Sequence, residues 1–190
     1  MNLFLEAINR PADAFKRRYS KLSWVFVIAA IIIVTVFDAV LSYILGHPDR
    51  QILMDIMKTI GGLFMAGILT YLLVCIAFWL ICKALGSKTG LPCYIHTWGI
   101  SYIPTVICAI IVIITENFFY VFWNNTVWGM LISVLLVGIL IWKIILYLIF
   151  LHEVAGLRGN RMVIAFILCG LVILMLAAAN GYLGLKSPIL

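Results

Sequence analysis

The chain has 190 residues, of which 66% are hydrophobic and 11% are charged, and its formal net charge at pH 7 is +6. Soluble domains contain about 45–50% apolar residues, so this composition excludes an ordinary soluble fold and leaves little room for a soluble catalytic domain. The cations flank apolar stretches instead of covering one soluble face, which favours anionic lipid headgroups over nucleic acid as their partner.

Residues 1–23 form the first predicted unit, a cytoplasmic N-terminal segment. Its apolar side chains, Phe15 among them, fall close to one helical face, and cations occupy much of the remainder. This pattern predicts an amphipathic helix lying in the cytoplasmic interface, although a loosely ordered basic flank that only fixes topology is the alternative. The cations that we expect to contact anionic headgroups are Lys16, Arg17, Arg18 and Lys21.

Residues 24–190 form the second predicted unit, which is dominated by apolar stretches of about 18–25 residues each. A helix needs about 20 residues to cross a bilayer, and lipid leaves the backbone no partner except its own chain. Continuous apolar runs favour helices over the alternating strands of a barrel. The sequence therefore predicts an all-α polytopic membrane bundle, with an amphipathic helix followed by five transmembrane helices. The stretches are 24–46, 59–82, 98–115, 127–151 and 162–185.

The distribution of Lys and Arg between the connections predicts the orientation of the chain. With a cytoplasmic N-terminus, the inner side receives the cations of residues 10–21, Lys83, Lys88, Arg158 and Arg161. The outer side receives only three, at positions 50, 58 and 186. Cytoplasmic loops carry the excess of Lys and Arg, so we expect a cytoplasmic N-terminus and an external C-terminus.

Two features of the second and third stretches bear on helix packing. Gly62, Ala66 and Thr70 follow one another at four-residue spacing, which predicts a seam where another helix approaches closely. Pro104 in the third stretch removes a backbone donor, so we expect a kink there and the most irregular span of the protein.

Two ionisable residues lie well inside predicted spans. Asp38 is roughly 21 Å along the first span from its inner end, and Lys143 lies about nine residues from the inner end of the fourth. A charge at mid-membrane costs about 2.5–3.5 kcal/mol on insertion scales, so such residues are candidates for an ion or proton pathway. They could instead pair, despite a depth difference of roughly 8 Å, or extend to opposite interfaces.

The inner end of the fourth stretch carries a candidate cytoplasmic partner surface made of His152, Glu153, Arg158 and Arg161. With Cys93 and His96 from the preceding inner connection, His152 and Glu153 include zinc-ligand types, but no H-E-x-x-H spacing is present. We expect Glu153 to pair with Arg158, with Arg161 or with a partner protein. We expect no metal, no cofactor and no disulfide. An intramembrane enzyme using His96, His152 and Glu153 is the least favoured function.

Three short segments resemble a known family. Residues 10–15 (Arg-Pro-Ala-Asp-Ala-Phe) precede a basic stretch and Trp24, and residues 101–104 read Ser-Tyr-Ile-Pro. Residues 152–157 (His-Glu-Val-Ala-Gly-Leu) follow Trp142 and precede Arg161. The chain thereby resembles the compact bacterial members of the Yip (Ypt-interacting protein) domain family. The resemblance implies five spans, a cytoplasmic N-terminus and a short external C-terminus.

The family has no settled catalytic residues, so the resemblance assigns none to this chain. Eukaryotic members are implied to bind Rab-type GTPases and to shape membranes, but this sequence lacks their long acidic-aromatic N-terminal region, which speaks against GTPase binding. Some compact bacterial members accompany ABC-type export or antimicrobial-resistance systems. We expect a non-enzymatic protein of a bacterial plasma membrane that binds other membrane proteins or organises the membrane. A small transporter or channel using Asp38 and Lys143 is the alternative.

Overall fold

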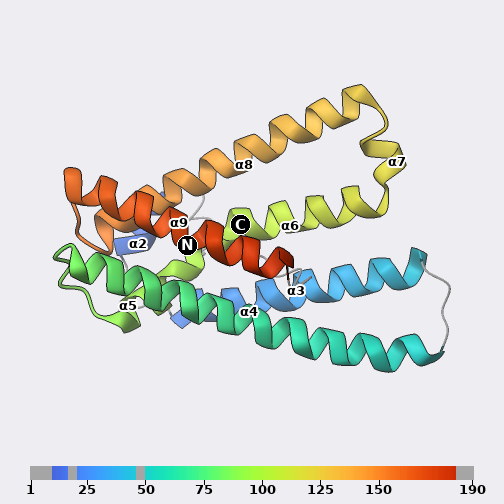
Figure 1. Cartoon of the computed structure of the whole chain (residues 1–190), viewed down its shortest axis with the longest axis horizontal. Coiled ribbons are helices and arrows are strands. Elements are labelled where there is room, and N and C mark those ends of the chain that lie inside the picture. Colours follow the sequence, from blue (N-terminus) through green and yellow to red (C-terminus); the bar gives the residue numbers. More distant parts are fainter. Residues whose placement is uncertain (1–9, 17–20, 46–49, 183–190) are drawn as a thin grey trace.

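The computed structural model describes residues 10–16, 21–45 and 50–182, and every regular element in these ranges is a helix (Figure 1). The elements are α2 (Pro11–Lys16), α3 (Lys21–Leu45), α4 (Arg50–Ala84), α5 (Leu91–Trp98), the 3-10 turn η1 (Gly99–Ser101), α6 (Tyr102–Asn117), α7 (Phe119–Phe122), α8 (Thr126–Glu153) and α9 (Asn160–Tyr182). Of the predicted headgroup-binding cations, Arg17 and Arg18 lie outside the described residues, as do the side chains of Lys16 and Lys21.

The helices have the length and composition of membrane spans. Four described stretches are long and apolar enough to cross a bilayer, namely Phe64–Ala84, Leu91–Asn117, Thr126–Glu153 and Asn160–Ala179. The 25-residue helix α3 adds a shorter apolar stretch, Phe26–Phe37. The prediction of an all-helical membrane bundle is therefore confirmed.

The connections gather at two ends of the bundle. The α4–α5 and α8–α9 connections lie at one end together with α2, whereas α7 lies at the other (Figure 1). We call the first of these the basic end, because exposed Lys83, Lys88, Arg158 and Arg161 all lie on or beside its two connections. The connections that the cation pattern assigned to the inner side thus share one end of the molecule.

The short helix α2 packs on protein. Phe15, which we predicted on the membrane-facing side of an amphipathic helix, is fully buried, and its ring meets that of Phe150 in α8 edge-on at 5.9 Å between centroids. Ala14 beside it is also fully buried. Residues 11–16 therefore cover the basic end of α8, and Phe15 has a protein neighbour in place of the expected lipid.

The third span is irregular, but its break does not lie at Pro104. The span starts at Leu91 instead of near Trp98, because Pro92 sits at the start of α5, where its fixed φ and missing N–H are tolerated. The 3-10 turn η1 then separates α5 from α6. Pro104 falls in the first turn of α6, where backbone N–H groups lack helical partners in any case, so it starts a new helix after the break.

Among the three glycines of α4, Gly67 makes the close contact with another helix. A Cβ added there would lie 3.2 Å from Cγ2 of Ile31 in α3, whereas one added at Gly62 would meet nothing within 4 Å. Gly62 is exposed, while Thr70 is buried and donates its hydroxyl to the Ala66 carbonyl at 2.7 Å. Gly62, which we predicted as a packing position, therefore makes no close contact within the described chain.

Replacing Gly67 by leucine should separate α3 from α4. Extra methylenes forced into a packed contact cost about 1–3 kcal/mol, and Ile31 leaves no room for the new side chain. The free energy of unfolding in mixed micelles should fall by that amount. Gly62→Leu on the same helix is the matched control and should be nearly neutral; equal losses for both variants would contradict the α3–α4 contact.

Candidate functional site

The α4–α5 connection begins with a tight glycine turn. Gly86 has a φ of +98°, its N–H donates to the Lys83 carbonyl at 3.1 Å, and the N–H of Ser87 donates to the Cys82 carbonyl at 2.9 Å. This pair of bonds is the Schellman arrangement that ends many helices. It turns the chain so that residues 85–90, which we call the first loop, run across the basic end.

The α8–α9 connection is stabilised by the same kind of local geometry. Gly156 and Gly159 have φ values of +68° and +57°, which glycine adopts without strain. The Leu157 N–H donates back to the Leu151 carbonyl at 3.2 Å, and Met162 at the start of α9 donates to Gly159 at 3.0 Å. Residues 154–159, the second loop, are thereby a compact turn between two spans.

Two hydroxyl groups join the loops. Ser87 donates to the Ala155 carbonyl and Thr89 donates to the Val154 carbonyl, each at 2.7 Å. Carbonyls just past a helix end have no intrahelical partner, so the first loop supplies the hydrogen-bond donors that the end of α8 lacks. The Ser87 hydroxyl also lies 3.3 Å from the Tyr94 hydroxyl of α5. The two connections are thus one structural unit, although they are far apart in sequence.

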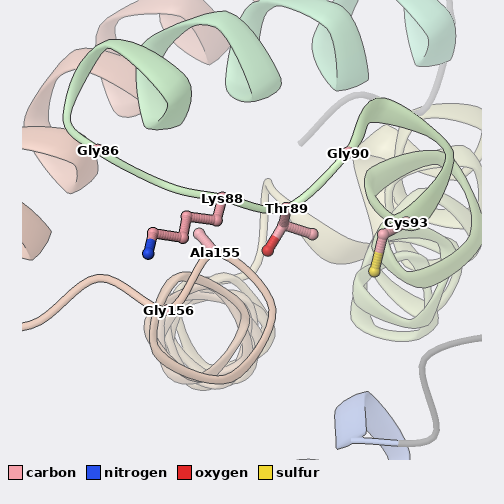
Figure 2. A pocket seen from close by; sticks show the side chains of 7 residues that line it. All are labelled: Gly86, Lys88, Thr89, Gly90, Cys93, Ala155 and Gly156. Carbon is pink, nitrogen blue, oxygen red and sulfur yellow. The ribbon is translucent and has the colours of Figure 1, made fainter.

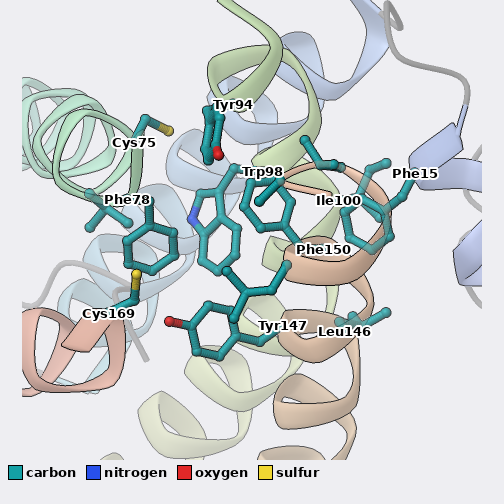
Figure 3. Close-up of a cluster of buried hydrophobic side chains, with 14 of the residues drawn as sticks. Phe15, Cys75, Phe78, Tyr94, Trp98, Ile100, Leu146, Tyr147, Phe150 and Cys169 are labelled. Carbon is teal, nitrogen blue, oxygen red and sulfur yellow. The ribbon is translucent and has the colours of Figure 1, made fainter. Parts of the chain in front are cut away.

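An aromatic cluster supports this unit from within the bundle (Figure 3). The Trp98 ring lies at its centre and meets Phe78 of α4 at 4.7 Å and Phe150 of α8 at 4.9 Å, both edge-on. Tyr94 meets Phe150 in the same way at 5.4 Å. Edge-to-face rings add about 0.5–1.5 kcal/mol per pair beyond their buried area. The aromatic cluster therefore ties α4, α5 and α8 together beneath the loops.

A cavity of about 520 Å³ opens between the paired loops. Figure 2 shows Lys88 and Thr89 extending from the first loop towards Ala155 and Gly156 of the second. The wall is otherwise made largely of glycine backbone, with Cys93 of α5 on one side. No lining residue is acidic; the full lining is Gly86, Lys88, Thr89, Gly90, Cys93, Ala155 and Gly156.

Removing both bridging hydroxyls should loosen the second loop. A hydrogen bond of this kind contributes about 1 kcal/mol, so Ser87→Ala combined with Thr89→Val should lower stability by about 2 kcal/mol. Hydrogen exchange should accelerate at residues 154–157. The control is Ser133→Ala, which removes an exposed hydroxyl bonded only within α8 at 2.8 Å. Unchanged exchange at 154–157 in the double variant would show that the loops do not hold each other.

The four residues of the predicted partner surface, His152, Glu153, Arg158 and Arg161, lie at the basic end. His152 Nδ1 lies 3.1 Å from Oε1 of the adjacent Glu153. Within the described chain, no ion pair joins Glu153 to Arg158 or to Arg161, so of the expected pairings only the one with a partner protein stays a prediction. The Arg161 guanidinium instead reaches the first loop, where it would lie 3.1 Å from a Cβ added to Gly86.

The candidate zinc ligands do not assemble. Cys93 is buried, and the Nδ1 atom of His96 is enclosed without a hydrogen-bond partner. Among the described residues, no three His, Cys, Asp or Glu side chains are placed to hold a metal ion. All five cysteines are free thiols.

Lys143 has a partner within the bundle. Its amino group donates to the Thr105 hydroxyl of α6 at 2.8 Å, about 15 Å along α8 from the basic end. Thr105 is buried. Asp38 lies in α3, but its side chain is outside the described residues, so pairing between Asp38 and Lys143 stays a prediction.

The bridging residues Ser87 and Thr89 and the cavity residue Lys88 did not enter our prediction of the site. The glycine-rich run at residues 86–90 is typical of a turn, and a turn alone gives no sign of what its hydroxyls contact. A signal was nonetheless present, because the fourth span ends in a segment whose carbonyls need donors from elsewhere. Two serine or threonine hydroxyls in the other inner connection are suitable donors.

Comparison with known proteins gives one family match. The family model described as the Yip1 domain matches residues 5–179, which include every span described above. No curated protein and no solved structure matches the chain.

Proposed function

Because the chain belongs to the Yip1 domain family, we propose that it is a non-enzymatic integral membrane protein that binds other membrane proteins through its last two spans, α8 and α9. In a bacterial plasma membrane, the N-terminus and the basic end would face the cytoplasm and the C-terminus the outside. The unequal burial of the spans is the observation that carries this proposal.

The spans are buried to very different extents. In the most apolar window of each span, 56% of residues are buried in Leu91–Asn117 and 33% in Phe64–Ala84. The corresponding values are only 22% for Thr126–Glu153 and 11% for Asn160–Ala179. Helices of a bundle bury one face against their neighbours, so α8 and α9 have much more surface free for lipid or for another protein.

The outer half of α8 is the clearest case. None of residues 126–145, all of which are described, is buried, and Val134 is 72% exposed. Figure 1 shows α8 and α9 diverging from the basic end. Gly138 has open space where a side chain would stand, and such small residues let a second helix approach closely in lipid. This surface suits a partner that is itself a transmembrane helix.

Photo-crosslinking from chosen positions tests the proposal in native membranes. A benzoylphenylalanine at Val134 of α8, or at Met175 of α9, which is 73% exposed, should crosslink to one discrete membrane protein. The control is Met65 of α4, which is 67% exposed but lies on a better-buried span. Lipid adducts alone from all three positions would contradict partner binding.

The resemblance to bacterial members makes an ABC-type exporter subunit the first partner to seek.

The contact between Lys143 and Thr105 supports a second candidate, a small transporter or channel. A cation inside the bilayer commonly marks an ion or proton pathway. The test is flux through reconstituted vesicles containing either the original protein or a variant with Asp38→Asn and Lys143→Met. Transport requires a flux that the double variant abolishes; equal flux for both proteins would exclude this function.

A further inference from the structure

We propose that the cavity between the paired loops binds the phosphate group of an anionic lipid headgroup, with Lys88 and Arg161 as its cationic contacts. This site goes beyond the proposed binding of membrane proteins, because it uses the basic end and not the exposed faces of α8 and α9.

The walls of the cavity suit an anion of headgroup size. Its volume is about 520 Å³, and the glycine backbone at Gly86, Gly90 and Gly156 leaves the space open. Lys88 is the charged lining residue, and it is exposed. The nearest acidic side chain along the second loop, Glu153, faces His152. An anion entering here meets a cation and no competing carboxylate from the lining.

Positive charge reaches the cavity from the first loop and from the first turn of α9. The Arg161 guanidinium of α9 would lie 3.1 Å from a Cβ added to Gly86, and Gly86 lines the cavity, so α9 supplies a second cation at the edge of the cavity. Exposed Lys83 and Arg158 flank the same end. An arginine guanidinium group can donate two parallel hydrogen bonds to a phosphate, whereas a lysine ammonium group attracts it as a point charge. The two residue types therefore complement each other in a phosphate site.

The end of α8 would repel an anion if its last carbonyls accepted no hydrogen bonds. A helix C-terminus carries partial negative charge on these groups. Here the hydroxyls of Ser87 and Thr89 donate to the carbonyls of Ala155 and Val154, at 2.7 Å each, and so offset that charge. The bridge between the loops thus also makes the cavity more favourable for phosphate.

The depth of the cavity favours a lipid over a soluble phosphate. In the last turns of α4 the Lys83 amino group lies 4.5 Å from the centroid of the Trp79 ring. Tryptophan concentrates at the membrane–water interface, where lysine reaches the headgroups. The first loop begins two residues after Lys83, so the cavity would open at headgroup level.

Lipid binding by the full chain in detergent, followed by native mass spectrometry, tests the site. Phosphatidylglycerol should bind better than phosphatidylcholine. The double variant Lys88→Gln with Arg161→Gln should weaken phosphatidylglycerol binding roughly thirtyfold, since each cation near a membrane surface contributes about 1 kcal/mol. The matched control is Arg50→Gln with Lys58→Gln, which removes the same charge from the other end of α4 and should leave binding unchanged.

A second variant fills the cavity without changing its charge. Gly90 has a φ of −78°, and a Cβ there would make only an ordinary contact with Pro92, at 3.7 Å. Gly90→Leu should therefore fold normally and still reduce phosphatidylglycerol binding severalfold. Equal losses for the Arg50/Lys58 control, or full binding by Gly90→Leu, would overturn the proposal. Binding of inorganic phosphate through Lys88 and Arg161 without lipid selectivity would also overturn it.

Discussion

Replacing Trp98 by alanine should lower the free energy of unfolding by about 3 kcal/mol, the largest effect that we expect from a single substitution. Trp98 is only 3% exposed and packs edge-on against rings from two other spans. Lipid is itself apolar, so the loss comes from the cavity and the missing ring contacts more than from transfer to solvent. Titration with sodium dodecyl sulfate in mixed micelles measures this energy.

The control for this prediction is another tryptophan. Trp128 of α8 is 49% exposed, so Trp128→Ala removes the same side chain without opening an internal cavity. It should cost well under half as much as Trp98→Ala. Comparable losses from the two substitutions would mean that the aromatic cluster does not hold the basic end together.

The contact between Lys143 and Thr105 should show a coupling energy of about 1.5–3 kcal/mol, the range for hydrogen bonds to charged groups. The donor–acceptor distance is 2.8 Å and Thr105 is buried, so few water molecules compete with the bond. A double-mutant cycle with Thr105→Val, Lys143→Met and the combined variant isolates this energy from the cost of each substitution alone.

Thr115 provides the comparison for this cycle. Its hydroxyl bonds to the Val112 carbonyl of its own helix at 3.1 Å, so Thr115→Val should show no coupling to Lys143→Met. Additive losses for Thr105→Val and Lys143→Met would contradict a direct bond. In that case the transporter alternative would also lose its structural support.

Hydropathy and length predicted the helices well because the bilayer imposes a strict requirement. A span must be about 20 residues and must satisfy its own backbone, so long apolar runs leave few alternatives. The cation pattern also grouped the correct connections, since Lys88 and Arg158 lie at the same end. The family resemblance was confirmed by the match over residues 5–179.

Details that depend on neighbouring helices could not be read from one sequence. Gly62 and Gly67 lie in the same apolar stretch, and only the position of Ile31 shows which glycine is pressed by another helix. Pro104 marked an irregular span, but η1 before it, and not the proline, contains the break. The bridge from Ser87 to Ala155 joins residues 68 positions apart, a distance at which local patterns carry no information.

Cysteine accessibility tests the central claim most directly, namely that both basic loops form one cytoplasmic surface on a bundle held in lipid. Single cysteines would replace Lys88, Arg158 and Asn124 in a background in which the five native cysteines are substituted. Membrane-impermeant maleimide should label Lys88→Cys and Arg158→Cys only from the cytoplasmic side, and Asn124→Cys only from outside. Labelling of Lys88→Cys and Arg158→Cys from opposite sides would contradict the claim.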